Sequence, residues 1–377
     1  MMTHGGDIYT NSGIQYDFSV SLNPLGPPEG AVSAVRESAA RIQCYPDPKC
    51  RALYEALSGS LGVPRGNILV GNGASALLRA AAQAVRPAHA YLPAPTYGGY
   101  ETALRQTDAQ IHRLCLREED GFALTDAFVR EFGEADTESA QGESTPAQGP
   151  AAQASQRNSD RILFLCNPNN PVGSCIDEGL LLRILGICEE RGIYCILDEC
   201  YMELTQDGAQ RSMTGRLREY PHLLVLRAFT KTYAMPGVRL GYMLGADKSL
   251  LERIALQLEE WSVSLPSQEA GLAALGDAQY LPRARKACAA ERAFLAEGLA
   301  GSGMKVYDGT ANFILFASGE PLFEKLRARG ILIRDCAGIP GLTPVKGAKY
   351  YYRVGVRGRS ENEALLEALE EVLLSAE

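Results

Sequence analysis

Short apolar runs that alternate with helix-length segments constrain the fold of this chain more than any other feature of its sequence. An example is RILFLCNP (161–168), which is followed by DEGLLLRILGICEERG (177–192) and then by YCILDECY (194–201). Strands that are apolar throughout and separated by helices are typical of a mainly parallel sheet covered on both faces. We therefore predict an α/β fold whose functional side chains gather beyond the carboxyl ends of the strands. The other strand candidates are residues 68–73, 90–94, 111–116 and 222–229.

The pattern changes near LPSQEAG (265–271), which opens a long helical region followed by strand-like segments up to YYYRVGVR (350–357). This order indicates a smaller α+β domain. We expect an N-terminal arm over 1–40 that is part of this small domain, a large cofactor-binding domain over 41–264 and a small C-terminal domain over 265–377. Residues 134–160 contain almost no bulky apolar side chain, so we predict a flexible surface insertion there.

Composition argues against several classes of function. The net charge of −8 lacks the basic footprint that nucleic-acid binding needs. No run of about 18 apolar residues predicts a membrane span. The segment MMTHGGDIYTNSG (1–13) lacks the basic and apolar regions of a secretory signal, so we expect a cytoplasmic protein. The ten cysteines form no CxxC pair and the four histidines are scattered, so we expect reduced thiols and no metal site.

Residues that can bind an anionic cofactor follow the ends of the strand candidates. Gly73, Ala74 and Ser75 join a strand to a helix start, where unpaired backbone N–H groups attract anions. The others are Tyr97, Asn170, Asp198, Tyr201, Thr230, Lys231 and Arg239. Alone, each has an ordinary structural explanation, such as a tight turn, a packed ring or a solvated charge. Together they match the needs of pyridoxal 5'-phosphate (PLP): an amine, a carboxylate for the pyridine nitrogen, donors to the ring oxygen, an aromatic ring and a phosphate cradle.

The sequence resembles the fold-type I PLP enzymes of the class I/II aminotransferase group over essentially its whole length. The resemblance implies a mainly parallel seven-stranded sheet with a smaller α+β domain. It gives catalytic roles to Lys231, which forms the Schiff base with PLP, to Asp198 at the pyridine nitrogen and to Tyr97 on the ring. It places the remaining contacts at the ring hydroxyl (Tyr201, Asn170) and at the phosphate (Gly73, Ala74, Ser75, Thr230, Arg239).

One position departs from the pattern of these enzymes. Three residues before the lysine they often carry a Ser or Thr that binds the phosphate, but this chain has Ala228. We therefore expect a modest loss of cofactor affinity.

The resemblance also extends to the substrate and to a second subunit. Arg353 matches the arginine that grips the substrate carboxylate with its planar fork. Tyr45 matches a tyrosine that reaches the cofactor phosphate of the neighbouring subunit, which implies a homodimer with shared sites. Further candidates for substrate contacts are Arg334, His4, Asn23 and Arg357.

Two families within the group remain open, and both act on small phosphorylated substrates. The segments HGGDIY, DFSVSLNPLG, WSVS and ILIRDCAGIPGL are more similar to the L-threonine-O-3-phosphate decarboxylases of cobalamin biosynthesis. The alternative is a histidinol-phosphate aminotransferase that uses 2-oxoglutarate and glutamate. The two reactions differ in which bond at the substrate α carbon stands perpendicular to the cofactor ring, and the sequence does not reveal that angle.

Two other classes of function fit less well. GNGASA (71–76) matches the dinucleotide-binding turn of a nicotinamide dehydrogenase. However, no acidic residue follows about 20 residues later to bind the ribose, and a dehydrogenase gives Lys231 no role. A PLP-binding regulator would need a DNA-binding module, for which the acidic chain leaves no room.

Overall fold

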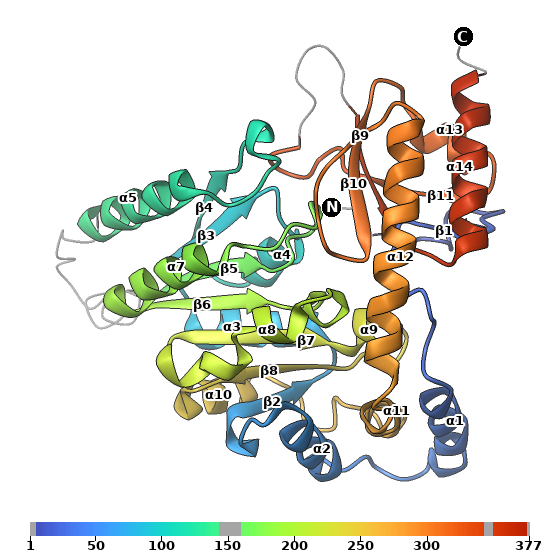
Figure 1. The fold of residues 1–377 in the computed structure, drawn as a ribbon. Helices are drawn as coiled ribbons and strands as arrows, with labels where there is room; N and C mark the ends of the chain where they lie inside the picture. Colours follow the sequence, from blue (N-terminus) through green and yellow to red (C-terminus); the bar gives the residue numbers. More distant parts are fainter. Residues whose placement is uncertain (1–4, 143–159, 343–349, 375–377) are drawn as a thin grey trace.

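The computed structural model describes residues 5–142, 160–342 and 350–374. Over these ranges the chain forms a seven-stranded sheet, a four-stranded sheet and a two-stranded pair. Figure 1 shows the large sheet layered between helices, with the four-stranded sheet and its helices beside one end of it.

The large sheet has the order β2-β8-β7-β6-β5-β3-β4. Its members are β2 (Ile68–Gly71), β8 (Gly241–Gly245), β7 (Leu223–Ala228), β6 (Ile193–Asp198), β5 (Arg161–Cys166), β3 (His89–Ala94) and β4 (Gln110–Cys115). Strand β8 runs antiparallel to both of its neighbours, and the other pairs are parallel. The predicted mainly parallel seven-stranded sheet is confirmed.

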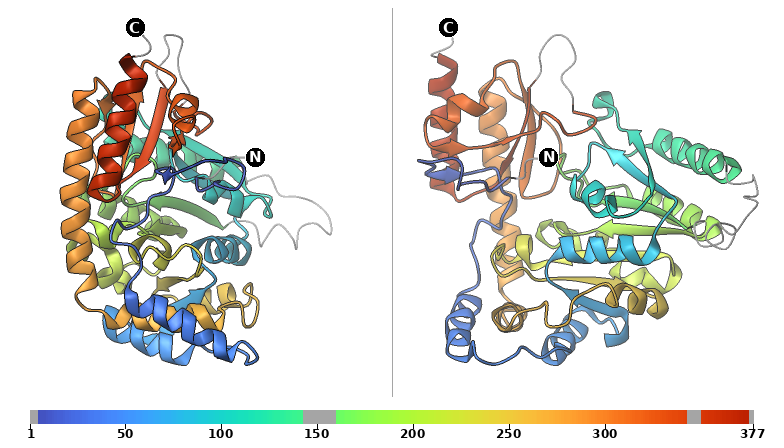
Figure 2. Two further views of the ribbon diagram at one scale, coloured as in Figure 1. Left: turned by 90° about the vertical axis from the view of Figure 1, so that its right-hand side faces the viewer. Right: turned by 180° about the vertical axis from the view of Figure 1, so that it is seen from behind.

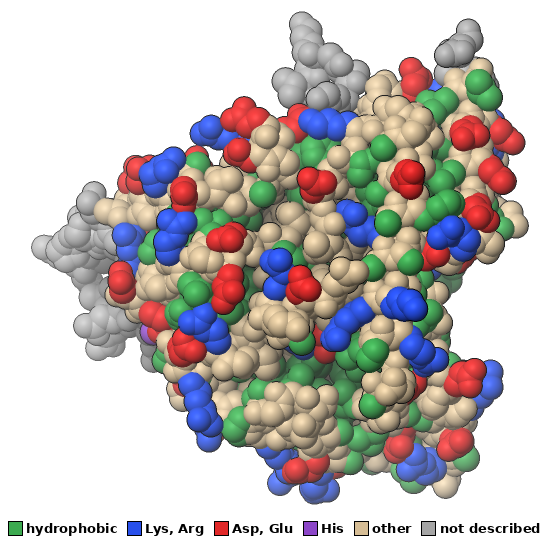
Figure 3. All heavy atoms as spheres, viewed as in Figure 1, with side chains coloured by type: hydrophobic (Ala, Val, Ile, Leu, Met, Phe, Trp, Pro, Cys, Tyr) green, Lys and Arg blue, Asp and Glu red, His purple; other side chains and the backbone are tan. Residues whose placement is uncertain are grey.

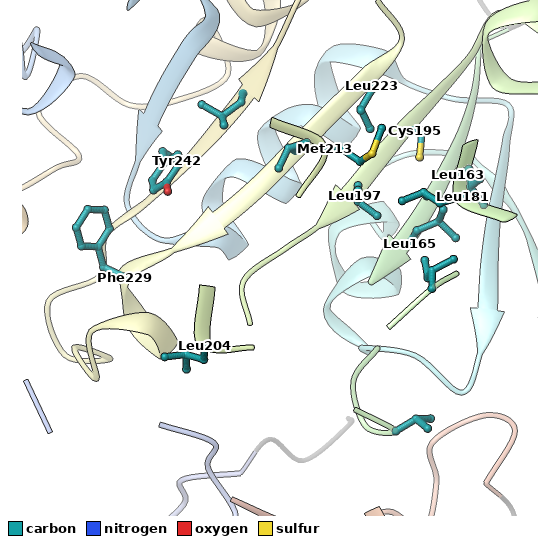
Figure 4. Packing of buried hydrophobic residues seen from close by; sticks show 14 of the residues in the cluster. Leu163, Leu165, Leu181, Cys195, Leu197, Leu204, Met213, Leu223, Phe229 and Tyr242 are labelled. Atoms are coloured by element: carbon teal, nitrogen blue, oxygen red, sulfur yellow. The ribbon is translucent and has the colours of Figure 1, made fainter. Parts of the chain in front are cut away.

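Successive residues of one strand are buried on opposite faces of this sheet, which explains why the strands are apolar throughout. Leu197 and Val225 belong to the core that includes residues of α2, α5 and α7, whereas Ile196 and Leu224 belong to the core with α3, α4 and α10. Figure 4 shows the first of these cores from close by. The covering helices are α2 (Arg51–Leu61), α3 (Ala74–Val85), α4 (Gly99–Leu104), α5 (Asp126–Gly142), α7 (Glu178–Arg191) and α10 (Lys248–Ala255).

The four-stranded sheet is antiparallel and carries helices on one face. Its order is β12 (Arg334–Asp335), β13 (Tyr350–Gly355), β10 (Phe313–Ser318) and β9 (Lys305–Val306). Apolar side chains of α12 (Tyr280–Gly301), α13 (Phe323–Arg327) and α14 (Arg359–Leu374) form one core with it. The long helix α12 extends from the four-stranded sheet alongside the large sheet (Figures 1 and 2).

The N-terminal residues contact both parts of the molecule. Strand β1 (Tyr16–Asp17) pairs in parallel with β11 (Ile331–Leu332). Helix α1 (Glu29–Ser38) packs on α11 (Leu265–Gly276), which also packs on α2 of the large sheet. The expected division into 1–40, 41–264 and 265–377 therefore stays a prediction, since both α1 and α11 contribute to the core of the large sheet.

The predicted flexible insertion over 134–160 is wrong for its first nine residues, because α5 continues to Gly142. Asp136 on this helix is 1% exposed and forms ion pairs with Arg161 (2.9 Å) and Arg191 (3.0 Å). Polar composition suggested mobility, but a buried carboxylate with two cationic partners anchors the helix. Residues 143–159 of the predicted insertion lie outside the described residues.

Short helices and turns connect these elements. They are η1 (Ala39–Arg41), η2 (Arg65–Asn67), η3 (Glu118–Asp120), η4 (Met202–Leu204), α8 (Gly208–Arg211), η5 (Met213–Glu219) and α9 (Phe229–Thr232). Acidic and basic side chains are interspersed over the face shown in Figure 3. Among the described residues, no helix is both long and apolar enough to cross a lipid bilayer.

Candidate active site

A cavity of about 350 Å³ lies at the carboxyl ends of β3, β5, β6 and β7. Side chains from both sheets and from the N-terminal arm meet there. Eleven of the residues predicted from the sequence line it: Ala74, Ser75, Tyr97, Asn170, Asp198, Tyr201, Thr230, Lys231, Arg239, Arg334 and Arg353. The parallel sheet brings these residues together because the strands that precede them end at one edge.

Lys231 lies in α9, directly after β7. Its Nζ is 5.9 Å from the ring centroid of Tyr201. Burial, together with the positive charge of Arg353, lowers the pKa of Lys231 from its ordinary 10.5 to about 8. An amine with this pKa is available both as a nucleophile and as a proton donor near neutral pH.

Asp198 ends β6 and is 6% exposed. Its Oδ2 accepts a hydrogen bond from the Tyr100 hydroxyl (2.9 Å), and its Oδ1 accepts one from the Cys200 backbone N–H (3.0 Å). Burial raises the pKa of this carboxyl, and these donors act against that rise. The sequence prediction missed Tyr100, although its place three residues after Tyr97 at the start of a helix was a usable signal.

The aromatic neighbours of the cavity are held by packing. The Tyr97 ring meets Tyr100 edge-on at 5.4 Å, and the Tyr100 ring stacks on Phe164 at 5.2 Å. A Cβ at Gly99 would lie 2.2 Å from the Tyr97 ring and would clash with it, so this position requires glycine. Tyr201 packs edge-on against Phe313 at 4.9 Å.

The turn at the start of α3 forms a cradle for an anion. Gly73 precedes the helix with a φ of +80°, and a Cβ there would lie 2.7 Å from Arg239 Nη2. The helix N-terminus therefore lies beside a guanidinium, and Ser75 and Thr230 line the same cavity. Ala228 lines the cavity too and supplies no hydroxyl there.

Arg353 projects from β13 into the cavity and is 8% exposed. Its Nη1 donates to Asn170 Oδ1 (2.6 Å) and its Nη2 donates to the Ser19 carbonyl (2.7 Å), whereas its buried Nε has no partner. Arg334 pairs with Arg353 across β12 and β13. Burial and the charge of Arg353 lower the pKa of Arg334. Two guanidiniums in one cavity favour a ligand with more than one anionic group.

The structure gives a supporting role to Asn23, which the sequence placed at the substrate. Asn23 does not line the cavity; its Nδ2 donates to the Thr232 carbonyl (2.8 Å) and its backbone N–H donates to the Lys231 carbonyl (3.2 Å). Asn23 therefore supports the backbone of the lysine segment. The structure does not bring Asn23 to the cavity, so its contact with the substrate stays a prediction.

Two other predicted residues do not line the cavity. Arg357 forms an ion pair with Glu361 at 3.4 Å and does not line the cavity. Tyr45 is 83% exposed and packs against Trp261 at a ring distance of 5.4 Å. His4 lies outside the described residues. Within the described ranges, no group of three metal-ligating side chains comes together.

The family model for class I and II aminotransferases matches residues 14–369. This chain belongs to that family. A threonine-phosphate decarboxylase from Salmonella typhimurium is 34% identical to this family member over 381 residues, which cover 98% of this chain and 96% of the relative. A histidinol-phosphate aminotransferase from Anaeromyxobacter sp. is 30% identical over 355 residues, which cover 93% of this chain and 89% of the relative.

A solved structure shows the same fold. The histidinol-phosphate aminotransferase from Sinorhizobium meliloti, in complex with PLP, matches with a TM-score of 0.81 over 100% of this chain and 96% of that one, at 21% identity. Class I and II aminotransferases are PLP-dependent enzymes. The cavity of this family member fits that cofactor, because Gly73 opens a cradle beside Arg239, Lys231 supplies an amine, and the buried Asp198 can hold a protonated ring nitrogen.

Proposed function

We propose that this enzyme decarboxylates L-threonine-O-3-phosphate to aminopropanol phosphate and CO2, the reaction placed in cobalamin biosynthesis. The observation that carries the proposal is the pair Arg334 and Arg353, which are register partners on the neighbouring strands β12 and β13 and both line the cavity that holds Lys231. A substrate with a carboxylate and a phosphate offers one anionic group to each guanidinium. The similarity to the decarboxylase of Salmonella typhimurium supports the same substrate.

In this proposal Lys231 binds PLP covalently and Asp198 holds its ring nitrogen, with Tyr97 on the ring. Tyr201 and Asn170 lie at the ring hydroxyl. Bound PLP supplies an electron-withdrawing ring that accepts the electron pair of the bond broken at the substrate α carbon. The phosphate contacts are Gly73, Ala74, Ser75, Thr230 and Arg239.

Arg353 and Lys231 perform the remaining steps. Arg353 binds the substrate carboxylate and orients the bond that joins it to the α carbon. When that bond breaks and CO2 leaves, the α carbon gains one proton. Lys231, whose bond to PLP would pass to the substrate amine, would then donate this proton as an ammonium, since its pKa of about 8 allows proton transfer near neutral pH.

Product analysis by mass spectrometry on the PLP-loaded protein tests this function. L-threonine-O-3-phosphate alone should give aminopropanol phosphate and CO2 in equal amounts. Glutamate formed from histidinol phosphate and 2-oxoglutarate, without CO2 from the first substrate, would overturn the proposal. That outcome would favour the aminotransferase alternative, which the 30% identical relative supports.

We also propose a homodimer in which Tyr45 of one protomer reaches the cofactor phosphate of the other. Ile42, Tyr45 and Leu256 are each more than 80% exposed, and Trp261 is 46% exposed. Large exposed apolar side chains in one region are typical of an interface. Light scattering should give the mass of two chains, and a fully active monomer would contradict the shared site. The cytoplasmic location stays a prediction from the sequence.

A further inference from the structure

The turn that follows β4 carries a carboxylate that accepts three hydrogen bonds from the four-stranded sheet. Oε1 of Glu118 accepts from Lys305 Nζ (2.8 Å) and from the Tyr307 hydroxyl (2.7 Å). Oε2 of the same residue accepts from the Tyr351 hydroxyl (3.0 Å). The Glu118 side chain, which belongs to the part of the chain that forms the large sheet, thus bonds to β9, to the residues just after β9 and to β13 of the four-stranded sheet.

The surroundings make this contact stronger than an ordinary surface ion pair. Tyr307 and Tyr351 are 3% and 6% exposed, and the Phe122 ring lies 5.3 Å and 6.0 Å from theirs. Burial raises the pKa of both tyrosines, so both hydroxyls stay protonated and donate. Without the carboxylate, two buried hydroxyls would lose an acceptor, which costs more than the loss of an exposed pair.

Strand β13 connects this contact to the cavity. Tyr352 and Val354 belong to the core under α12 and α14, whereas Tyr351 belongs to the core of the large sheet. Because side chains alternate along a strand, Arg353 lies on the same face as Tyr351, about 7 Å further along. The residue that bonds to Glu118 and the residue that enters the cavity are therefore neighbours on one rigid strand.

Close backbone contacts show that the two parts meet tightly around the cavity. A Cβ at Gly341 would lie 2.6 Å from the carbonyl oxygen of Ala94, which precedes the Tyr97 segment. A Cβ at Gly309 would lie 2.8 Å from the Gly173 carbonyl carbon. At such an interface a small shift of β13 moves Arg353 relative to Lys231.

We propose that Glu118 is a positioning residue for the reaction: its three hydrogen bonds hold the four-stranded sheet against the large sheet and thereby fix Arg353 at the substrate carboxylate. The proposal rests on the function proposed above for Arg353. It does not depend on whether the enzyme is a decarboxylase or an aminotransferase, since L-threonine-O-3-phosphate and the 2-oxoglutarate of the alternative reaction both carry a carboxylate.

Steady-state kinetics on the holoenzyme, with a matched control, test this role. Glu118→Gln should raise the KM for L-threonine-O-3-phosphate about tenfold and change kcat by less than about threefold, as expected when hydrogen bonds that orient a binding group are lost. Glu119→Gln is the control, because Glu119 stands on the same turn with its side chain 72% exposed. It should leave both constants unchanged, and Glu118→Asp should recover part of the lost affinity.

Amide hydrogen exchange of residues 350–355 gives a readout that needs no substrate. Exchange in Glu118→Gln should be about tenfold faster there than in the parent and unchanged in β5 and β6, which lie in the centre of the large sheet. The exchange measurement allows the role of Glu118 to be tested separately from the proposed function. A parent enzyme that turns over neither substrate would overturn the proposed function, whereas the exchange rates would still show whether Glu118 holds β13 in place.

Tyr351→Phe covers the case in which Glu118→Gln does not fold, because it removes one hydroxyl and keeps the ring. It should raise KM and speed exchange in the same direction, and its effect should not add to that of Glu118→Gln in the double variant. Unchanged KM and unchanged exchange in these variants would overturn the proposal. So would a fall in kcat with KM unchanged.

Discussion

The hydroxyl of Tyr100 donates a 2.9 Å hydrogen bond to Oδ2 of Asp198 from a site where Tyr100 is fully buried. Phe164 stacks on the Tyr100 ring from one side, so the hydroxyl is fixed in direction. A carboxylate at this depth is costly to keep ionised unless donors surround it. Tyr100 thus supports the charge that a protonated cofactor ring needs as its partner.

Tyr100→Phe should reduce kcat about tenfold or more, since a hydrogen bond to a charged group contributes about 1.5–3 kcal/mol. The substitution removes one donor and raises the pKa of Asp198 further, which weakens its hold on a protonated ring nitrogen. Absorbance titration of the holoenzyme with pH should show the ring nitrogen losing its proton at lower pH than in the parent. Equal titration curves and equal kcat would contradict this role.

Gly73→Ala should weaken PLP binding, because the added Cβ would lie 2.7 Å from Arg239 Nη2 and the backbone φ of +80° is strained for alanine. We expect the dissociation constant for PLP to rise about tenfold, the equivalent of about 1.4 kcal/mol. Equilibrium dialysis of the apoprotein measures it. Gly59→Ala is the matched control: it stands inside α2 with nothing within 4 Å and should leave the constant unchanged.

The rate at which PLP attaches to the apoprotein should rise with pH and level off above a midpoint of about 8. Only the neutral amine attacks, and burial with the charge of Arg353 lowers the pKa of Lys231 to about 8 from 10.5. Stopped-flow absorbance gives the profile. Arg353→Gln removes that charge, so its midpoint should move to higher pH. A midpoint near 10.5 in the parent protein would show that the lysine is not perturbed.

The lowered pKa of Lys231 also predicts how the free energy of unfolding of the apoprotein depends on pH. The unfolded chain holds the Lys231 proton up to the ordinary pKa of 10.5, whereas the folded apoprotein releases it near 8. Between these values the unfolded state binds more protons, so the contribution of Lys231 to stability rises with pH. Comparing urea unfolding of the parent with that of Lys231→Met across this window isolates the contribution, which should be absent in the variant.

Asp136→Asn should lower the free energy of unfolding by about 2–3 kcal/mol, because it leaves two arginines without their buried partner. Asp136 pairs with Arg161 and Arg191 and accepts from the Tyr91 hydroxyl (3.1 Å). Urea unfolding measures the change. Glu134→Gln on the exposed side of the same helix should change stability by less than about 0.5 kcal/mol. If both variants are equally stable, the ion pairs do not anchor α5.

Much of the fold and cavity could be predicted because local sequence determines them. Apolar strands followed by helices require a covered parallel sheet, and such a sheet brings the ends of its strands to one edge. Lys231, Asp198 and Tyr97 therefore line one cavity. The role of Tyr100 could not be predicted in this way, since it depends on how α4 packs on Phe164.

The features that the sequence did not show share a physical cause: each depends on contacts between distant parts of the chain. Composition around residue 136 favoured a mobile segment, but Arg161 and Arg191 come from other elements and anchor it. Asn23 carries an amide suited to a ligand, yet its partners are backbone groups of the lysine segment. Sequence spacing cannot show such partners before the fold is known.

Locating the lysine that binds PLP is the most direct test of the active site. Reducing the holoenzyme with borohydride fixes the cofactor to its lysine, and peptide mass spectrometry then locates it. We predict a phosphopyridoxyl group on Lys231 at about one per chain, and none after reduction of Lys231→Ala, even if PLP still docks in the cavity. Label on another lysine, or full activity of Lys231→Ala, would contradict the site described here.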